Sequence, residues 1–91
     1  MPARNIRVVH YHREFLARFD KLPHQIQSLA KKKESWFLAN PFDPRLHTHK
    51  LKGELEGYWS YSLNYQYRIL FRFLANDEAI YYDIGTHEIY R

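Results

Sequence analysis

The sequence predicts an α+β domain whose elements follow in the order strand, helix, helix, strand, strand, strand. Two observations predict it: apolar side chains recur at helical spacing between residues 13 and 40, and they alternate along the chain from residue 58 onward. With 91 residues the chain has room for one core, so a single domain over residues 1–91 is expected. The strands need cover for one apolar face, which predicts an antiparallel sheet with a two-helix hairpin packed on that face.

The first strand and both helices are expected in the first 40 residues. The segment NIRVVHYH at 5–12 is rich in β-branched residues and alternates, as strands do. The segment 13–22 has apolar residues at every third or fourth position, which is typical of a helix. Pro23 ends that helix and suits the first turn of the next one, and Asn40 before Pro41 ends the second helix.

Three strands are predicted at 58–64, 67–74 and 79–84, after a loop that holds two prolines and two glycines. Their alternation assigns the following side chains to the helix-covered face: Trp59, Tyr61, Leu63, Tyr67, Ile69, Phe71, Phe73, Ile80, Tyr82 and Ile84. The other face is expected to stay open and to carry a second set: Ser60, Ser62, Arg68, Arg72, Tyr81 and Asp83. The histidine-bearing loop and the chain end can border this open face.

The composition excludes several classes of site and partner. There is no cysteine, which excludes a thiolate metal site and a disulfide-stapled domain and fits a reducing compartment. No apolar run is long enough to span a membrane, and the first residues lack the apolar centre of an export signal, so a cytoplasmic protein with no membrane partner is expected. The net charge of +4 and the six histidines favour polyanions as partners.

The loop sequence HTHKLKG contains the first candidate site residues. His47 and His49 are two residues apart, but no carboxylate or third imidazole stands at a diagnostic spacing, so neither a metal site nor a cofactor is predicted. Lys50 and Lys52 would present two ammonium groups on the solvent side of an extended segment. These groups suit the phosphates of a nucleic acid, and the alternative is that they only keep the surface soluble.

A run of three lysines, Lys31, Lys32 and Lys33, stands on the second predicted helix. The run is interpreted as a solvated helix face, with binding of RNA or of an acidic partner as the alternative. Lys33 falls within the apolar stripe of that helix. Its stem is therefore expected along apolar surface, with the ammonium group in water.

Arg68 stands in an aromatic-rich strand, so its guanidinium needs a polar partner. The planar fork of an arginine can hold two oxygens of a phosphoryl group that gains charge. The alternative is a structural ion pair with Asp83 or with a nearby Glu.

The chain end, DIGTHEIYR, places His87 just after a strand that Gly85 terminates. An imidazole at the rim of the open face would suit proton transfer near neutral pH, and Tyr90 could stack on a base. The alternative is that Ile89 and Tyr90 pin the tail to the core while His87 caps a turn.

The segments HKLKGELEGYWSYSLNYQYRILFRF and IYYDIGTHEIYR, with NPF after the second helix, resemble the RelE/ParE superfamily of bacterial toxins. The resemblance covers nearly the whole chain and is strongest to the RelE, YoeB and YafQ branch. It implies a RelE-like fold and the toxin of a type II toxin–antitoxin module, with a cognate antitoxin as its partner. Members of this branch are endoribonucleases that cut mRNA in the ribosomal A site. There the ribose 2′-hydroxyl attacks the adjacent phosphate and leaves a 2′,3′-cyclic phosphate, without a metal.

The resemblance also implies roles for individual residues. His49 stands where such toxins have a histidine or glutamate ahead of an L-x-G motif, and it is the candidate general base. Arg68 matches the strand arginine that contacts the scissile phosphate. His87 matches a C-terminal histidine that protonates the leaving 5′-oxygen, and Tyr90 falls near a terminal aromatic residue that orients the substrate. The remaining expected RNA-binding residues are Lys50, Lys52, Arg72 and Arg91.

Two alternatives stay open. YafQ-like relatives have a histidine and an aspartate where Ser62 and Gln66 stand here, so the division between acid and base roles is not fixed. The function could also be that of a ParE-like protein that poisons DNA gyrase by binding, or of an inactive RNA-binding homologue. His49 and His87 favour the nuclease, because a gyrase-binding protein has no need of paired imidazoles.

Overall fold

The computed structural model describes residues 5–86 and 89. Its elements are β1 (Val8–Tyr11), α1 (Arg13–Asp20), α2 (His24–Ala39), η1 (Pro44–Leu46), β2 (His49–Lys50), η2 (Gly53–Leu55), β3 (Trp59–Ser62), β4 (Arg68–Leu74) and β5 (Glu78–Gly85). The two η elements are short 3₁₀ helices. Within these residues no helix has both the length and the apolar character needed to cross a membrane.

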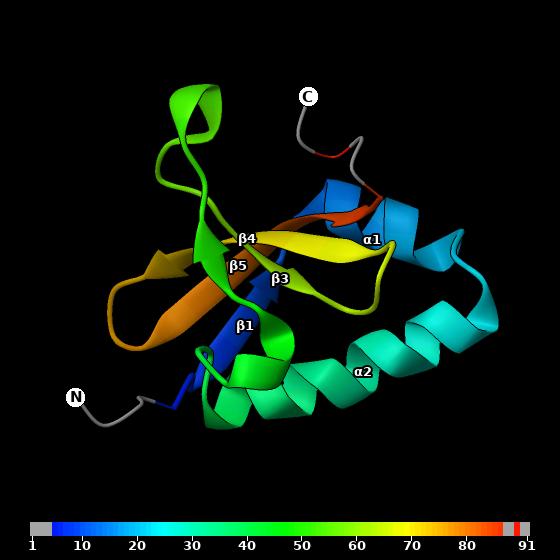
Figure 1. Cartoon of the computed structure of the whole chain (residues 1–91), viewed down its shortest axis with the longest axis horizontal. Coiled ribbons are helices and arrows are strands. Elements are labelled where there is room, and N and C mark those ends of the chain that lie inside the picture. The colour runs from blue at the N-terminus through cyan, green and yellow to red at the C-terminus, as the bar shows by residue number, and fades with distance from the viewer. Residues whose placement is uncertain (1–4, 87–88, 90–91) are drawn as a thin grey trace.

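The five strands form one sheet in the order β1, β5, β4, β3, β2 (Figure 1). The predicted α+β class and the order of the elements are confirmed. However, the sheet is mixed rather than antiparallel throughout, because β1 runs parallel to β5, and it has an additional short strand, β2. A short hairpin link makes two consecutive strands antiparallel, but it does not determine the direction of a strand that is distant in the sequence. The partner of Val8 is Glu78, 70 residues later, so the alternation pattern contains no signal for the direction of β1.

Both helices form where the sequence predicts them. The Nδ1 atom of His12 accepts a hydrogen bond of 3.1 Å from the backbone N–H of Glu14 and so caps α1. Pro23 precedes the first turn of α2. That helix ends at Asn40, which is extended because Pro41 follows it.

The two helices pack on one face of the sheet around an aromatic centre. The ring of Phe37, from α2, is fully buried, and its centroid lies 4.9 Å from that of Phe71 and 5.0 Å from that of Tyr61. Phe15, from α1, joins the same cluster through the ring of Tyr81, at 5.2 Å. Such aromatic pairs contribute about 0.5–1.5 kcal/mol each beyond the area they bury. The core therefore holds together segments that are far apart in the sequence.

A β-bulge in β5 changes which of its side chains reach the core. The register passes from Leu70 opposite Asp83 to Phe71 opposite Tyr81, so Tyr82 has no partner residue in β4. The positions before the bulge and those after it therefore follow opposite phases of the alternation.

The bulge explains where the face assignment made from the sequence is wrong. Tyr81, expected on the open face, is 1% exposed and belongs to the core. Ile80 and Tyr82, expected in the core, are only partly buried and lie outside the core cluster. Ile84 lies beyond the bulge and is buried, as predicted.

The second face of the sheet is less open than predicted. Ser60 is fully buried, and Ser62 and Leu70 are nearly so. Arg68 is half-buried, whereas Arg72, at the other end of β4, is exposed. Only part of this face can therefore meet a ligand.

The described part of the tail covers one end of that second face. A Cβ atom at Gly85 would stand only 2.8 Å from Cγ2 of Ile89, so the glycine makes room for the Ile89 side chain. Ile89 is 5% exposed. The alternative interpretation of the tail is therefore supported at Ile89, while its other two residues, His87 and Tyr90, lie outside the described residues.

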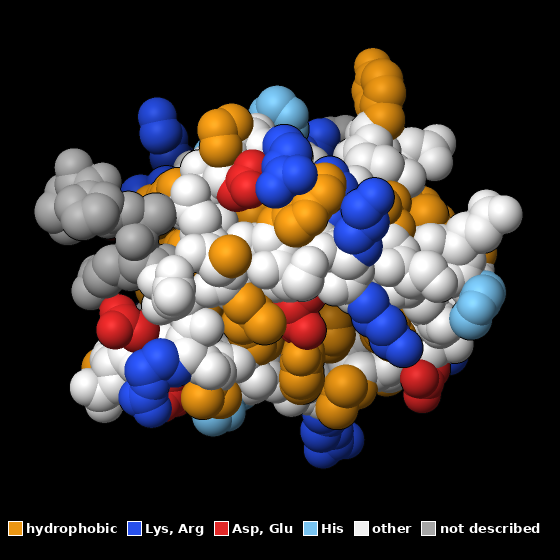
Figure 2. Space-filling model, turned by 90° about the horizontal axis from the view of Figure 1, so that it is seen from below, with side chains coloured by type: hydrophobic (Ala, Val, Ile, Leu, Met, Phe, Trp, Pro, Cys, Tyr) orange, Lys and Arg blue, Asp and Glu red, His pale blue; other side chains and the backbone are white. Residues whose placement is uncertain are grey.

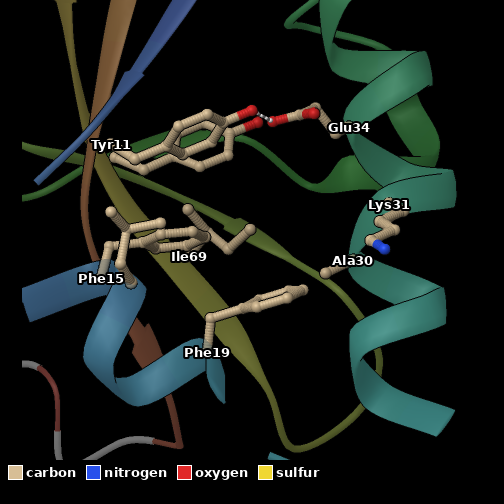
Figure 3. Close-up of a pocket in the computed structure, with 9 residues that line it drawn as sticks. Tyr11, Phe15, Phe19, Ala30, Lys31, Glu34 and Ile69 are labelled. Atoms are coloured by element: carbon tan, nitrogen blue, oxygen red, sulfur yellow. Dashed lines mark hydrogen bonds between the residues drawn. The ribbon is translucent and has the colours of Figure 1, made fainter. Parts of the chain in front are cut away.

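The core also contains paired hydroxyl groups. The Oη atoms of Tyr61 and Tyr81 lie 2.8 Å apart, and burial raises the pKa of both phenols, so both stay neutral. Close by, the hydroxyl of Tyr11 donates a 2.8 Å hydrogen bond to Glu34 and links β1 to α2 (Figure 3). Burial and the Glu34 carboxylate raise the pKa of Tyr11 as well.

Removing one hydroxyl of the buried pair should cost nearly as much as removing both. Tyr61→Phe or Tyr81→Phe leaves the other hydroxyl without its partner and should lower the free energy of unfolding by about 1–3 kcal/mol. The double variant removes both groups, so its loss should be smaller than the sum of the single losses. Urea unfolding of the four proteins measures this coupling, and strictly additive losses would contradict it.

Candidate functional site

Arg68 is the first residue of β4, and its side chain lies on the sheet face opposite the aromatic core. Its Nη1 atom donates a 2.9 Å hydrogen bond to Oγ of Ser62, the residue directly across on β3. Its Nε atom is buried and has no hydrogen-bond partner among the described residues. A buried donor without a partner costs about 1–3 kcal/mol, so the protein alone satisfies this guanidinium poorly.

The structural alternative for Arg68, an ion pair with Asp83, is not formed. A carboxylate oxygen of Asp83 lies 3.5 Å from Nε of Arg18 on α1 and accepts a hydrogen bond from the backbone N–H of Ile84. Burial raises the pKa of Asp83, and these two contacts oppose that rise. Within residues 5–86 and 89, Arg68 has no carboxylate partner, which suits an arginine that binds an anionic ligand.

His49 lies on the same face as Arg68, two strands away. It pairs with Ser60 of β3, which pairs with Leu70 of β4, and side chains at paired positions point to the same face. Neighbouring strands are about 4.8 Å apart, so β2 and β4 are separated by roughly 10 Å. The Nδ1 atom of the exposed His49 ring lies 3.0 Å from the carbonyl oxygen of His47, which can only accept a hydrogen bond. In the neutral ring, Nε2 is then the basic nitrogen.

A shallow pocket of about 440 Å³ opens beside Arg68, where α2, η1 and the β3–β4 turn meet. Its polar lining consists of Lys33, Arg45, His47, Ser62, Asn64 and Arg68. Figure 2 shows that Lys and Arg side chains gather on the face of the molecule that carries α2. The volume is typical of a ligand site, and the positive lining favours an anion.

The two predicted phosphate-binding lysines, Lys50 and Lys52, lie apart from this pocket. Lys50 pairs with Trp59, whose side chain packs on the core side, so Lys50 and His49 point to opposite faces of the sheet. Lys52 is exposed at the start of η2, on the β2–β3 connection that projects from the sheet (Figure 1).

Arg72 shares a face with Arg68 but lies four residues further along β4, a distance of about 13 Å. Its guanidinium carbon lies 5.4 Å from the ring centroid of Tyr58, a cation–π contact. The ring of Tyr58 in turn contacts that of Tyr82, with centroids 5.3 Å apart. Arg72 therefore belongs to a separate aromatic cluster on this face.

Three predicted site residues lie outside the described part of the chain: His87, Tyr90 and Arg91. Ile89 is described and packs against Gly85, which pairs with Arg68 across the β4–β5 ladder. The side chain at position 89 thus reaches the same end of the sheet face as Arg68.

No group of three His, Asp or Glu side chains within residues 5–86 is arranged to hold a metal ion. A second pocket, of about 180 Å³, lies between α1 and α2 (Figure 3). Its walls are mainly apolar, from Phe15, Phe19 and Ile69, and its acidic group, Glu34, is held by Tyr11. The volume falls below the range of about 300–1,000 Å³ that is usual for ligand sites, so this pocket is not the candidate site.

The pocket beside Arg68 contains residues that the sequence does not place in the site: Arg45 and Tyr65 have no predicted role, and RNA binding by Lys33 is only an alternative. Lys33 stands in the apolar stripe of α2, and its ammonium nitrogen lies 4.8 Å from the ring centroid of Trp36, a cation–π contact that the sequence does not predict. In the sequence, only the position of Lys33 within the apolar stripe of α2 indicates that this side chain faces the body of the protein. Arg45 stands in the three-residue helix η1 and Tyr65 in the β3–β4 turn, and neither segment is long enough for a periodicity that shows which way a side chain points.

Replacing Arg68 by Met should leave the protein about as stable. Met keeps an apolar stem and removes a buried donor that has no partner, but it also leaves the Ser62 hydroxyl without its donor, so the two effects oppose each other and the free energy of unfolding should change by less than about 1 kcal/mol. The control Arg18→Met removes the partner of Asp83 and should lower it. Urea unfolding measures both, and a loss above about 1 kcal/mol for Arg68→Met would make Arg68 a structural residue.

No protein-family model matches the chain, and no curated protein matches it. Solved structures do match. The RelBE2 toxin–antitoxin complex from Mycobacterium tuberculosis has a TM-score of 0.77 at 18% identity, over 94% of this chain and 98% of that chain. YafQ from E. coli has a TM-score of 0.72 at 15% identity, over 90% and 94%. The archaeal RelE–RelB complex from Pyrococcus horikoshii has a TM-score of 0.71 at 16% identity, over 91% and 96%. The chain therefore has the fold of the RelE, YoeB, YafQ and ParE-type toxins, as its sequence resemblance predicts.

Proposed function

We propose that the protein is the toxin of a type II toxin–antitoxin pair and that it cuts messenger RNA in the ribosomal A site, in the cytoplasm. Its fold is that of toxins such as YafQ and RelE. Fold alone does not determine activity, so the nuclease proposal depends on the site.

The observation that carries the proposal is the state of Arg68. Its guanidinium is half-buried, donates one hydrogen bond to Ser62 and keeps a buried Nε without a partner among the described residues. A charged donor group held in this way is preorganised to bind an oxyanion, because it needs little reorganisation when the ligand binds. His49 lies on the same sheet face and can supply the base.

In the proposed reaction the 2′-hydroxyl of one ribose attacks the phosphorus of the adjacent phosphodiester. Nε2 of His49 takes the hydroxyl proton, the bond from phosphorus to the 5′-oxygen breaks, and His87 gives a proton to that oxygen. The guanidinium of Arg68 stabilises the charge on the phosphoryl oxygens, and Tyr90 orients the substrate. The products are a 2′,3′-cyclic phosphate and a 5′-hydroxyl. DNA lacks the nucleophile, so only RNA is cut.

A protein antitoxin is the proposed partner. Similar structures include a RelE–RelB complex and a YoeB–YefM complex from Staphylococcus aureus. The net charge of +4 suits an acidic segment that folds over the toxin and covers its site.

Purified protein should cut messenger on translating ribosomes and leave 2′,3′-cyclic phosphate ends, which end-specific labelling detects. His49→Ala should lower the rate by about 10²–10⁴-fold, since it removes the base, and Arg68→Ala by about 10²–10³-fold, since it removes an oxyanion donor. His24→Ala is the matched control: this histidine is exposed at the start of α2, and its loss should leave the rate unchanged.

Uncut messenger with folded protein would reject the nuclease proposal. If the same protein instead blocked supercoiling by DNA gyrase, and did so equally with His49→Ala, a gyrase-binding toxin would replace it. Salt-dependent RNA binding without cyclic-phosphate products would identify a binding protein that lacks catalysis.

A further inference from the structure

The pocket beside Arg68 gathers positive charge from separate segments of the chain. Lys33 comes from α2, Arg45 from η1 and Arg68 from β4, and the imidazole of His47 lies among them. No acidic side chain is among the described residues that line it. Like charges brought together in this way repel one another, so an anion in the pocket would be favoured.

Arg45 is held in a fixed position. Its Nε and Nη2 atoms donate hydrogen bonds of 3.0 and 2.8 Å to the carboxylate of Asp43, and its guanidinium carbon lies 3.6 Å from the ring centroid of Trp36. The pair lowers the pKa of Asp43 to about 2 and raises that of Arg45. Asp43 occupies one side of the guanidinium fork, which leaves Nη1 to meet a ligand.

Lys33 lies against the same Trp36 ring and close to Arg45. Partial burial, followed by the charges of Arg45 and Lys32, lowers the pKa of its ammonium group. A phosphate next to Lys33 would relieve this repulsion. Lys31, two residues earlier, instead lines the groove between α1 and α2.

Tyr65 adds an exposed ring at the rim of the pocket. Its side chain is 91% exposed, in the turn between β3 and β4. The side-chain oxygen of Asn64 accepts hydrogen bonds from the backbone N–H groups of Gln66 and Tyr67 and so fixes that turn. An aromatic ring on a fixed turn next to cationic side chains is a platform on which an unpaired base can stack.

We infer that this pocket binds a backbone phosphate of single-stranded RNA, next to the phosphate that Arg68 holds, while the base of the same nucleotide stacks on Tyr65. This inference rests on the proposed function, because it extends the RNA strand from the reacting phosphate toward α2. Arg68 links this pocket to the proposed site of cleavage, since it lines the pocket and shares its sheet face with His49.

An RNA phosphate fits the pocket better than the carboxylate of an acidic protein segment. The exposed Tyr65 ring offers a base the stacking surface that single-stranded nucleic acids use, whereas an aspartate or glutamate side chain gains little from it. The pocket is also continuous with Arg68, whose planar fork matches a phosphoryl group.

The test compares Lys33→Gln with Lys31→Gln, two neutralising changes in one lysine run. A fluorescent 2′-O-methyl RNA oligonucleotide, which cannot be cut because its nucleophile is blocked, is titrated by anisotropy at several salt concentrations. Lys33→Gln should weaken binding several-fold and reduce the slope of log K against log[salt] by about 0.7, the value of one phosphate contact on a single strand. Lys33→Arg should restore both, and Lys31→Gln should match the original protein.

Tyr65→Ala should also weaken binding but leave the salt slope unchanged, because a stacked ring releases no counterions. Equal affinity and slope for Lys33→Gln and Lys31→Gln would overturn the inference, and so would the absence of RNA binding at low salt. Polyglutamate that displaces the RNA and loses affinity more strongly than RNA does in Lys33→Gln would assign the pocket to an acidic protein instead.

The outcomes separate this inference from the proposed function. A salt-slope change at Lys33 without any messenger cleavage would keep the phosphate pocket and reject the nuclease. Cleavage by the original protein, with no salt-slope change at Lys33, would keep the nuclease and reject the pocket.

Discussion

The packing of Phe37 against rings from three neighbouring strands holds α2 on the sheet, and the position of every other element follows from it. Phe37 is fully buried against Tyr61, Phe71 and Tyr81, one residue from each of β3, β4 and β5. It fixes α2 on the sheet, and the fixed helix carries Lys33 to the end of the sheet where Arg68 lies. The candidate site can thus combine residues from distant segments because one aromatic cluster fixes the positions of those segments relative to one another.

The two faces of the sheet differ in whether their buried polar groups have hydrogen-bond partners. On the core side, the buried hydroxyls of Tyr61 and Tyr81 pair with each other, and the more exposed hydroxyl of Tyr11 pairs with Glu34. On the other side, Arg68 keeps a buried donor that no described residue satisfies. This contrast is typical of a fold that stabilises its core fully and leaves an unsatisfied charge where a ligand binds.

Much of the fold could be predicted from the sequence, because both helices and the last three strands have clear apolar periods and proline or asparagine boundaries. The direction of β1 could not, since it depends on a pairing with β5 across nearly the whole chain. Nor could the faces of Ile80, Tyr81 and Tyr82, because a bulge shifts the period without a glycine or proline to mark it. In the site, Arg68 could be predicted from its residue type in an aromatic strand, whereas Arg45 and Tyr65 stand in a three-residue helix and a turn, which are too short to show a period.

The shortness of β2 has a consequence for how copies of the protein meet. An unpaired strand edge is a template on which a second chain can add a strand, and this is a common route to aggregation. β2 spans only His49 and Lys50, both exposed and polar, so it offers few free backbone groups on that side of the sheet. A basic domain that exposes aromatic rings such as Tyr65 is thereby protected, at this edge, from joining its neighbours into a continuous sheet.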